Sequence, residues 1–138
     1  MHLEMSNTNC PLCKRLVATN GWMASRPYIV QVSLWWRASK PPSQNYSISL
    51  RLRNAEGRQV AQTDSLHPVL GLYPTSLWDA GEIVEDYYEL RADPGDRSLA
   101  YHVEILVYWK DQSGQLHNLQ IGDSEDDHLA LPAQSVEP

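Results

Sequence analysis

The 138-residue sequence contains no phenylalanine, so its aromatic volume comes entirely from five tryptophans and seven tyrosines. These rings carry a polar group and are found at rims and interfaces as well as in cores. Basic residues are few, and the formal net charge of −6 argues against a surface for nucleic acid. No run of about 18 apolar residues is present, so no direct membrane insertion is expected. The first residues also lack the basic start and apolar stretch of a signal peptide.

Cysteine is almost absent, and the two residues present, Cys10 and Cys13, form a single C-x-x-C pair. A structural zinc site needs four ligands, and a redox motif needs a βαβ context that the sequence does not offer. Half a metal site and a redox pair are the alternatives, and an inert pair is the interpretation that we favour. Phosphate-binding glycine loops, the G-x-S-x-G motif and paired catalytic carboxylates are also missing. The sequence therefore predicts neither an enzyme nor a cofactor.

Three segments show a nearly strict alternation of apolar and polar side chains. The apolar positions are Tyr28, Val30, Val32, Leu34 and Trp36, then Tyr46, Ile48, Leu50 and Leu52, and finally Leu99, Tyr101, Val103, Ile105, Val107 and Trp109. A period of two is typical of strands that bury one face. With turn signals between short strands and no helix of useful length, the pattern predicts an all-β, two-layer antiparallel β-sandwich of about six to eight strands. We expect it to be immunoglobulin-like or carbohydrate-module-like.

The chain is expected to hold one domain with a segment on either side of it. Residues 1–25 are predicted to be a loosely ordered leader, 26–122 the sandwich, and 123–138 an acidic flexible tail. Within the domain, strands are predicted at 28–38, 45–53, 58–63, 82–90, 98–110 and 116–121. The long connection at 64–81 is expected to be either functional or a crossover between sheets.

Trp35 is the first candidate for a ligand contact. Its neighbour Trp36 is one of the alternating residues that face the core, so the Trp35 side chain should point away from the core. An outward indole can stack on a sugar, pack against another domain, or be covered by part of its own chain, and a protein tends to cover such a ring. All three interpretations stay open, and cover by the protein itself is the one that we favour.

The long connection supplies the other candidates, Tyr73, Trp78 and Asp79. Aromatic rings beside hydroxyls and a carboxylate are typical of the lining of a carbohydrate site. Trp78 can equally close the end of the sandwich as a plug, which is the interpretation that we favour. A glycan site, if present, would use Trp35, Tyr73, Trp78 and Asp79.

Several charged positions have simpler explanations than chemistry. Asp86 lies at one of the alternating positions of its strand that are otherwise apolar. Such a position predicts an edge strand, a bulge or a partnered carboxylate. The side chains of His102 and Glu104 should project from the same exposed face of their strand. No nucleophile lies beside them, so a catalytic role is not expected. The acidic residues Asp123, Glu125, Asp126 and Asp127 lack the pattern of a calcium loop and are read as solvated.

Several stretches together suggest a family. They are VSLWWRA at residues 32–38, the hairpin at 46–64, LYPTSLW at 72–78 and GEIVED at 81–86. In this order they resemble the C-terminal, extracytoplasmic β-sandwich domain of bacterial multispanning glycosyltransferases that use lipid-phosphate-linked mannose. The resemblance covers about residues 28–122, and it implies no catalytic residue, because the chemistry of that family belongs to its membrane portion.

The resemblance implies an accessory module that binds glycan or positions a neighbouring domain. The alternative is a structural protein–protein interaction domain with no small ligand. The module would be extracytoplasmic if it belongs to a longer membrane protein, and otherwise cytoplasmic.

Overall fold

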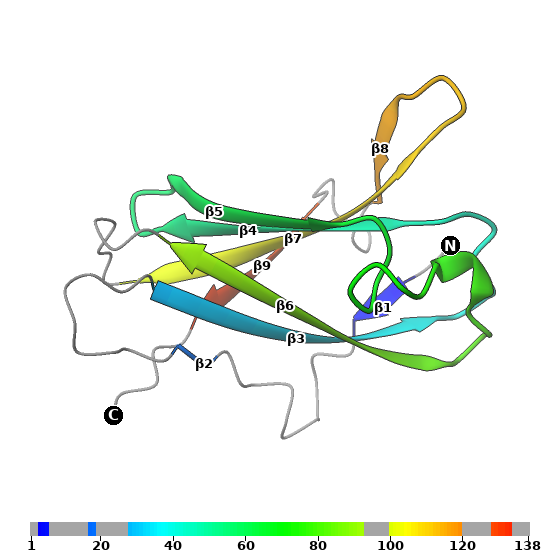
Figure 1. Cartoon of the computed structure of the whole chain (residues 1–138), viewed down its shortest axis with the longest axis horizontal. Coiled ribbons are helices and arrows are strands. Elements are labelled where there is room, and N and C mark those ends of the chain that lie inside the picture. Colours follow the sequence, from blue (N-terminus) through cyan, green and yellow to red (C-terminus); the bar gives the residue numbers. More distant parts are fainter. Residues whose placement is uncertain (1–2, 6–16, 19–27, 93–99, 120–127, 134–138) are drawn as a thin grey trace.

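The computed structural model describes residues 3–5, 17–18, 28–92, 100–119 and 128–133, and these form two antiparallel β-sheets that pack face to face (Figure 1). Sheet A contains β1 (Leu3–Met5), β2 (Val17–Ala18), β3 (Tyr28–Ala38) and β6 (Ile83–Ala92). Sheet B contains β4 (Ser47–Asn54), β5 (Gln59–Ser65), β7 (Tyr101–Lys110), β8 (Leu116–Asn118) and β9 (Leu129–Ala133). The one described helical element is the 3-10 turn η1 (Thr75–Leu77). The predicted all-β sandwich is confirmed.

Long antiparallel ladders set the register within each sheet. In sheet A, β6 follows β3 over ten residue pairs, from Tyr28 opposite Ala92 to Arg37 opposite Ile83. In sheet B, β4 lies between β5 and β7, so the order runs β5-β4-β7. The far edge of β7 pairs with β9 near its start and with β8 near its end. Figure 1 shows the β7–β8 hairpin extending beyond the two layers.

The core lies between the sheets and is made by the predicted alternation. Every second residue of β3 from Val30 to Ala38 is buried, and the inward residues of β4 and β7 meet them from sheet B. The largest fully buried side chain is Trp36. Because a one-residue shift of any strand would turn its apolar set outward, this burial also fixes the register.

Three strands lie where the sequence predicted none. β1 and β2 pair with the free edge of β3, and β9 pairs with β7, although all three are short and show no alternation of their own. β9 contains Pro132, which an edge strand tolerates because one side of it makes no ladder hydrogen bonds. Cys10, Cys13 and the acidic residues 123–127 lie outside the described residues.

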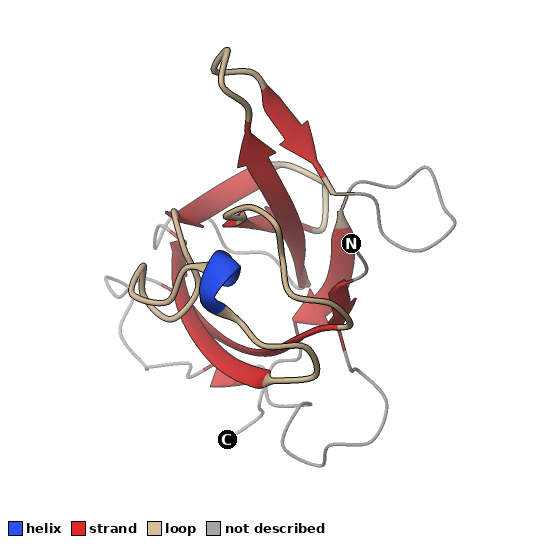
Figure 2. Cartoon of the chain, turned by 90° about the vertical axis from the view of Figure 1, so that its right-hand side faces the viewer, coloured by secondary structure: helices blue, strands red, loops and turns tan. Residues whose placement is uncertain are grey.

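The turn between β4 and β5 and the crossover between the sheets are present. Gly57 has a φ of +80° in the turn between β4 and β5, as a left-handed turn position requires. A bulge interrupts the same hairpin, because Leu52 pairs with Ala61 but Arg53 pairs with Gln59. The connection from residue 66 to residue 82 joins β5 of sheet B to β6 of sheet A, so it is the sheet-to-sheet crossover. Figure 2 shows η1, within this crossover, at one end of the sandwich.

Candidate functional site

The four residues predicted to touch a ligand do not form one site. Trp35 lies on the outer face of sheet A, as predicted, and is half-buried. Tyr73 and Trp78 lie together in the crossover, with ring centroids 6.1 Å apart and planes tilted by 53°. Asp79 follows them and is exposed. Within the described part of the chain, no ring contact or hydrogen bond joins Trp35 to this group.

Trp78 belongs to the core. Its side chain is 2% exposed and packs in the same cluster as Trp36 and the inward residues of both sheets. The ring therefore offers no surface to a sugar, and the plug is the interpretation that the burial supports. Its Nε1 is buried without a hydrogen-bond partner, which is unusual for a buried indole.

Hydrogen bonds to the Glu82 carboxylate hold the second half of the crossover together. The Tyr73 hydroxyl donates to both carboxylate oxygens of Glu82, at 2.9 and 3.1 Å, and the Asp79 backbone N–H donates to the same carboxylate at 3.0 Å. The hydrogen bond to Glu82 raises the pKa of Tyr73 above its usual value. The Tyr73 hydroxyl and the Glu82 carboxylate satisfy each other, so we assign them to holding the loop, whereas the Asp79 carboxylate is exposed beside them.

Asp86 is a buried carboxylate with four partners. Oδ2 accepts hydrogen bonds from Trp36 Nε1 at 3.0 Å and from the Tyr88 hydroxyl at 2.6 Å. Oδ1 accepts from the backbone N–H groups of Val69 at 2.8 Å and Tyr87 at 3.1 Å. Burial, together with the hydrogen bond to Asp86, raises the pKa of Tyr88. The predicted partnered carboxylate is confirmed, and through Val69 it fixes the crossover to β6.

Residues 66–72, here called the leucine loop, have an unusual backbone. Val69 and Leu70 have φ values of +58° and +56°, which is a left-handed conformation that β-branched and bulky residues rarely adopt. Gly71 continues it at +83°. Such strain persists only where the surroundings determine it, and here the Asp86 carboxylate and the buried Pro68 do so.

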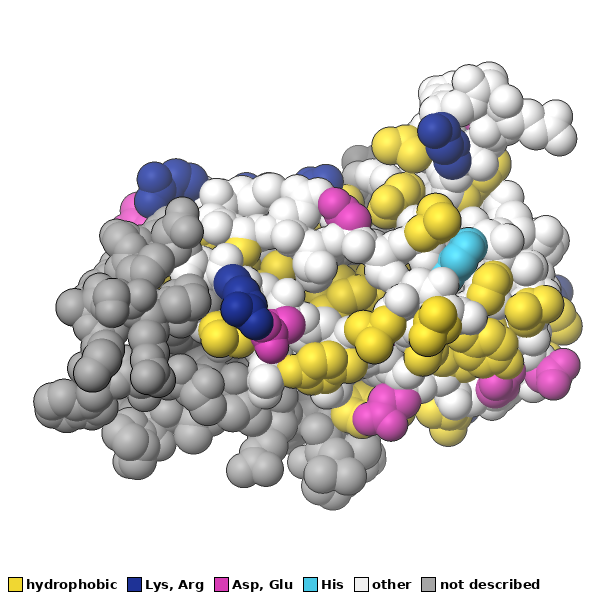
Figure 3. Space-filling view, in the orientation of Figure 1, with side chains coloured by type: hydrophobic (Ala, Val, Ile, Leu, Met, Phe, Trp, Pro, Cys, Tyr) yellow, Lys and Arg dark blue, Asp and Glu magenta, His cyan; other side chains and the backbone are white. Residues whose placement is uncertain are grey.

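The leucine loop presents apolar side chains to solvent. Leu66, Leu70 and Leu72 are 71%, 73% and 79% exposed, and Leu77 and Ile83 at the same end of the sandwich are also exposed. Figure 3 shows apolar side chains gathered over this end. Single exposed leucines are ordinary, but a cluster of them on one surface is typical of an interaction site.

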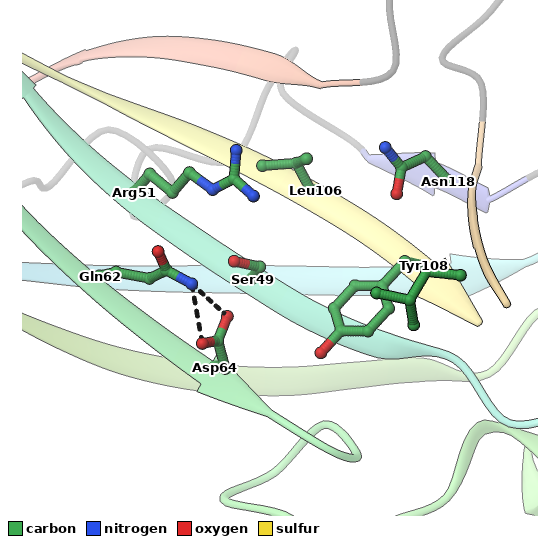
Figure 4. Close-up of a pocket in the computed structure, with 8 residues that line it drawn as sticks. Ser49, Arg51, Gln62, Asp64, Leu106, Tyr108 and Asn118 are labelled. Atoms are coloured by element: carbon green, nitrogen blue, oxygen red, sulfur yellow. Dashed lines mark hydrogen bonds between the residues drawn. The ribbon is translucent and has the colours of Figure 1, made fainter. Parts of the chain in front are cut away.

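A groove of about 260 Å³ lies on the outer face of sheet B (Figure 4). Its lining comes from four neighbouring strands: Ser49, Arg51, Gln62, Asp64, Leu106, Tyr108, Leu116 and Asn118. Two polar atoms in it, Ser49 Oγ and Arg51 Nε, are buried without a hydrogen-bond partner. Sequence reasoning missed this groove, because its residues come together only through the register of β5, β4, β7 and β8.

Two further clusters of titratable groups lie on the outer surface of sheet B. Glu104 lies 2.7 Å from Arg53 Nε and 3.8 Å from His102 Nε2, so it forms an ion pair on the sheet surface. Asp111 contacts His117 at 2.8 Å, and this hydrogen bond is the main cause that lowers the pKa of Asp111. The described residues contain no group of three or more His, Cys, Asp or Glu placed to hold a metal ion. Nor does this part of the chain contain a helix with the length and apolar character needed to cross a bilayer.

No protein-family model matches the chain, and no curated protein matches it.

Proposed function

We propose that this chain is a non-catalytic accessory β-sandwich module that positions a neighbouring protein domain through its leucine loop. The observation that carries the proposal is the exposure of Leu66, Leu70 and Leu72 on a backbone that the core holds in a strained conformation. A loop that only connected two sheets would gain stability by adopting ordinary φ values and covering its leucines.

The rigidity of the leucine loop supports docking. Val69 is hydrogen-bonded to Asp86, and the Ser47 hydroxyl donates to the Leu66 carbonyl at 3.0 Å. Backbone hydrogen bonds from Gly71 to His67 and from Tyr73 to Pro68 close the loop further. A surface that is already ordered loses little conformational entropy when a partner binds, which favours affinity.

The chemistry of the flanking strands favours a protein over a lipid surface. Glu82, which is bonded to Tyr73 of the crossover, precedes β6, and exposed carboxylates follow at Glu85 on β6 and occur at Asp64 on β5. An anionic bilayer would be repelled by these groups and by the net charge of −6, whereas an apolar protein surface would not. The resemblance to domains appended to bacterial membrane glycosyltransferases supports a neighbouring domain on the extracytoplasmic side.

Site-specific photo-crosslinking in the source cells tests the proposal. The photoreactive residue p-benzoylphenylalanine is placed at Leu70 in the full coding sequence, and in a second strain at Glu56, an exposed residue in the β4–β5 turn at the other end of the sandwich. We expect one specific protein adduct, or an intramolecular adduct with another domain, from position 70 and not from position 56. In a binding assay with that purified partner, the Leu70→Asn and Leu72→Asn double variant should lose about tenfold or more in affinity.

Three outcomes would overturn this function. They are the same adducts from both positions, adducts with lipid alone, and adducts only with a second copy of the chain. A double variant that folds and binds the partner with unchanged affinity would also exclude the leucine loop as the docking surface.

Glycan binding is the second candidate function, and the groove on sheet B is the observation that favours it. The aromatic set around Trp78 does not support it, because that ring is buried and Tyr73 is bonded to Glu82. A groove with a polar lining that includes Arg51, Gln62 and Asp64 is a better fit to a sugar.

A further inference from the structure

We infer that the groove on the outer face of sheet B is a binding site for one acidic sugar unit, of the hexuronic acid type, with the sugar carboxylate at Arg51. The inference deepens the second candidate function and is independent of docking through the leucine loop. At about 260 Å³ the groove is slightly smaller than the range of about 300–1,000 Å³ usual for small-molecule sites, which suits a single ring.

Strand register builds the groove from two cross-strand rows. Ser49 of β4 lies opposite Asp64 of β5 on one side and opposite Leu106 of β7 on the other. Arg51 lies opposite Gln62 in the next row. Because residues two apart share a face, the side chains of both rows project to the same outer surface (Figure 4).

Arg51 is the cation of the groove and has no carboxylate of its own. Its cross-strand neighbour on β7 is Glu104, but that carboxylate is bound to Arg53 Nε at 2.7 Å. Arg51 makes no ion pair or hydrogen bond through its side chain within the described part of the chain, and its Nε is buried. The two Nη groups have no partner either but are not buried, so they are the groups that can donate to an anionic oxygen of a ligand.

Ser49 adds a second unsatisfied group on the same strand. The residue is 3% exposed, and its Oγ is buried without a hydrogen-bond partner. Because this Oγ has no accessible surface, we assign Ser49 to the floor beneath the ligand rather than to a contact with it.

The opposite side of the groove accepts hydroxyls and packs against a ring. Gln62 Nε2 donates to both oxygens of Asp64, at 2.8 and 3.1 Å, which orients the carboxylate and leaves lone pairs for ligand hydroxyls. Leu106, Tyr108 and Leu116 supply apolar surface for the C–H face of a sugar. A hexuronic acid combines the carboxylate, the hydroxyls and the apolar face that this lining requires.

Titration of the folded 138-residue chain with defined small molecules tests the site. The probes are methyl glucuronide, methyl glucoside, which lacks the carboxylate, and glycine, which carries a carboxylate without a sugar ring. We expect saturable NMR shifts at Ser49, Arg51 and Asp64 with methyl glucuronide at a Kd on the order of 1 mM, and affinities at least about tenfold weaker for the other two.

Two arginine variants on one strand provide the matched comparison. Arg51→Gln should reduce the affinity for methyl glucuronide by about tenfold, to the level of methyl glucoside, because a charge-assisted bidentate contact is lost. Arg53→Gln, which removes an arginine already paired with Glu104, should change the affinity less than about twofold.

Several results would overturn the inference. Equal affinity for glucuronide and glucoside would remove the role of Arg51, and glycine binding as tightly as glucuronide would exclude a sugar site. Absence of any saturable shift would exclude the groove as a binding site altogether. None of these results bears on the crosslinks expected from Leu70.

Discussion

Asp86 is the residue through which the core, the strand β6 and the leucine loop are joined. Its carboxylate binds Trp36 and Tyr88 within sheet A and the backbone of Val69 in the crossover. The position of Asp86 among otherwise apolar residues predicted an edge strand, a bulge or a partnered carboxylate. The partners could not be predicted, because Trp36 and Val69 are 50 and 17 residues away in the sequence and meet Asp86 only in the packed molecule.

We expect Asp86→Ala to lower the free energy of unfolding by about 3 kcal/mol or more, because the Trp36, Tyr88 and Val69 donors are left buried without an acceptor. Glu85→Ala, at the exposed neighbouring position, should change it by less than about 0.5 kcal/mol. Urea unfolding followed by tryptophan fluorescence measures both variants. An Asp86→Ala variant as stable as the parent protein would show that these hydrogen bonds carry no net stability.

At the scale of elements, the leucine loop has a backbone conformation of high energy, which the rest of the fold stabilises. Alternation predicted β3, β4, β6 and β7 well, because each is long and buries one face. It failed for β1, β2 and β9, which are too short to show a period and form because the edges of β3 and β7 offer partners. The backbone of the leucine loop was not predictable either, because Val69 and Leu70 are residues that local preference keeps out of left-handed conformations.

Leu70→Asn should raise the free energy of unfolding by about 0.5–1 kcal/mol, because asparagine tolerates the φ of +56° better than leucine does and the side chain that is removed is 73% exposed. The same substitution at Leu72, which does not have a positive φ, should bring no gain. Thermal and urea unfolding measure the difference. Equal effects at both positions would contradict the idea that strain is stored at Leu70.

This prediction separates stability from function in one substitution. If the leucine loop docks a partner, Leu70→Asn stabilises the free protein and weakens the complex, which is the usual relation between stability and activity at strained sites. A variant that loses both would indicate a general structural defect.

At the scale of the whole molecule, the dependence of stability on alkaline pH follows from two tyrosines. The pKa values of Tyr73 and Tyr88 lie above the ordinary value of 10.0 in the folded protein. In the unfolded chain both hydroxyls ionise near pH 10, so the unfolded state loses protons first. The stability that these groups contribute is therefore complete below pH 10 and declines as the pH rises beyond it.

We expect Tyr88→Phe to be less stable than the parent protein at pH 8, and the difference to shrink above pH 10, because the parent protein alone loses stability through this hydroxyl. Tyr87→Phe, at an exposed neighbouring position, serves as the control and should follow the parent curve. Urea unfolding at pH 8, 10 and 11 gives the comparison. A constant difference between Tyr88→Phe and the parent across this range would contradict the raised pKa of Tyr88.

The sandwich as a whole was predictable from the sequence, whereas the groove on its surface was not. Fold class depends on which positions are apolar, and that is visible in the sequence. The groove depends on which residue of β5 or β7 faces Ser49 and Arg51, and the bulge between Leu52 and Arg53 alters that register. Cross-strand neighbours of this kind are fixed by turns and bulges, which local patterns describe poorly.

The double-sided pairing of β7 has a consequence for the order in which the molecule comes apart. β4 follows one edge of β7 from Tyr101 to Tyr108, while β9 and β8 cover much of the other. Strands with one neighbour, such as β5 and β6, can therefore fray and exchange their amide hydrogens with solvent while β7 stays closed. The slowest-exchanging amides should belong to β7, so the groove floor at Leu106 would persist in partly opened forms in which the leucine loop has already been released.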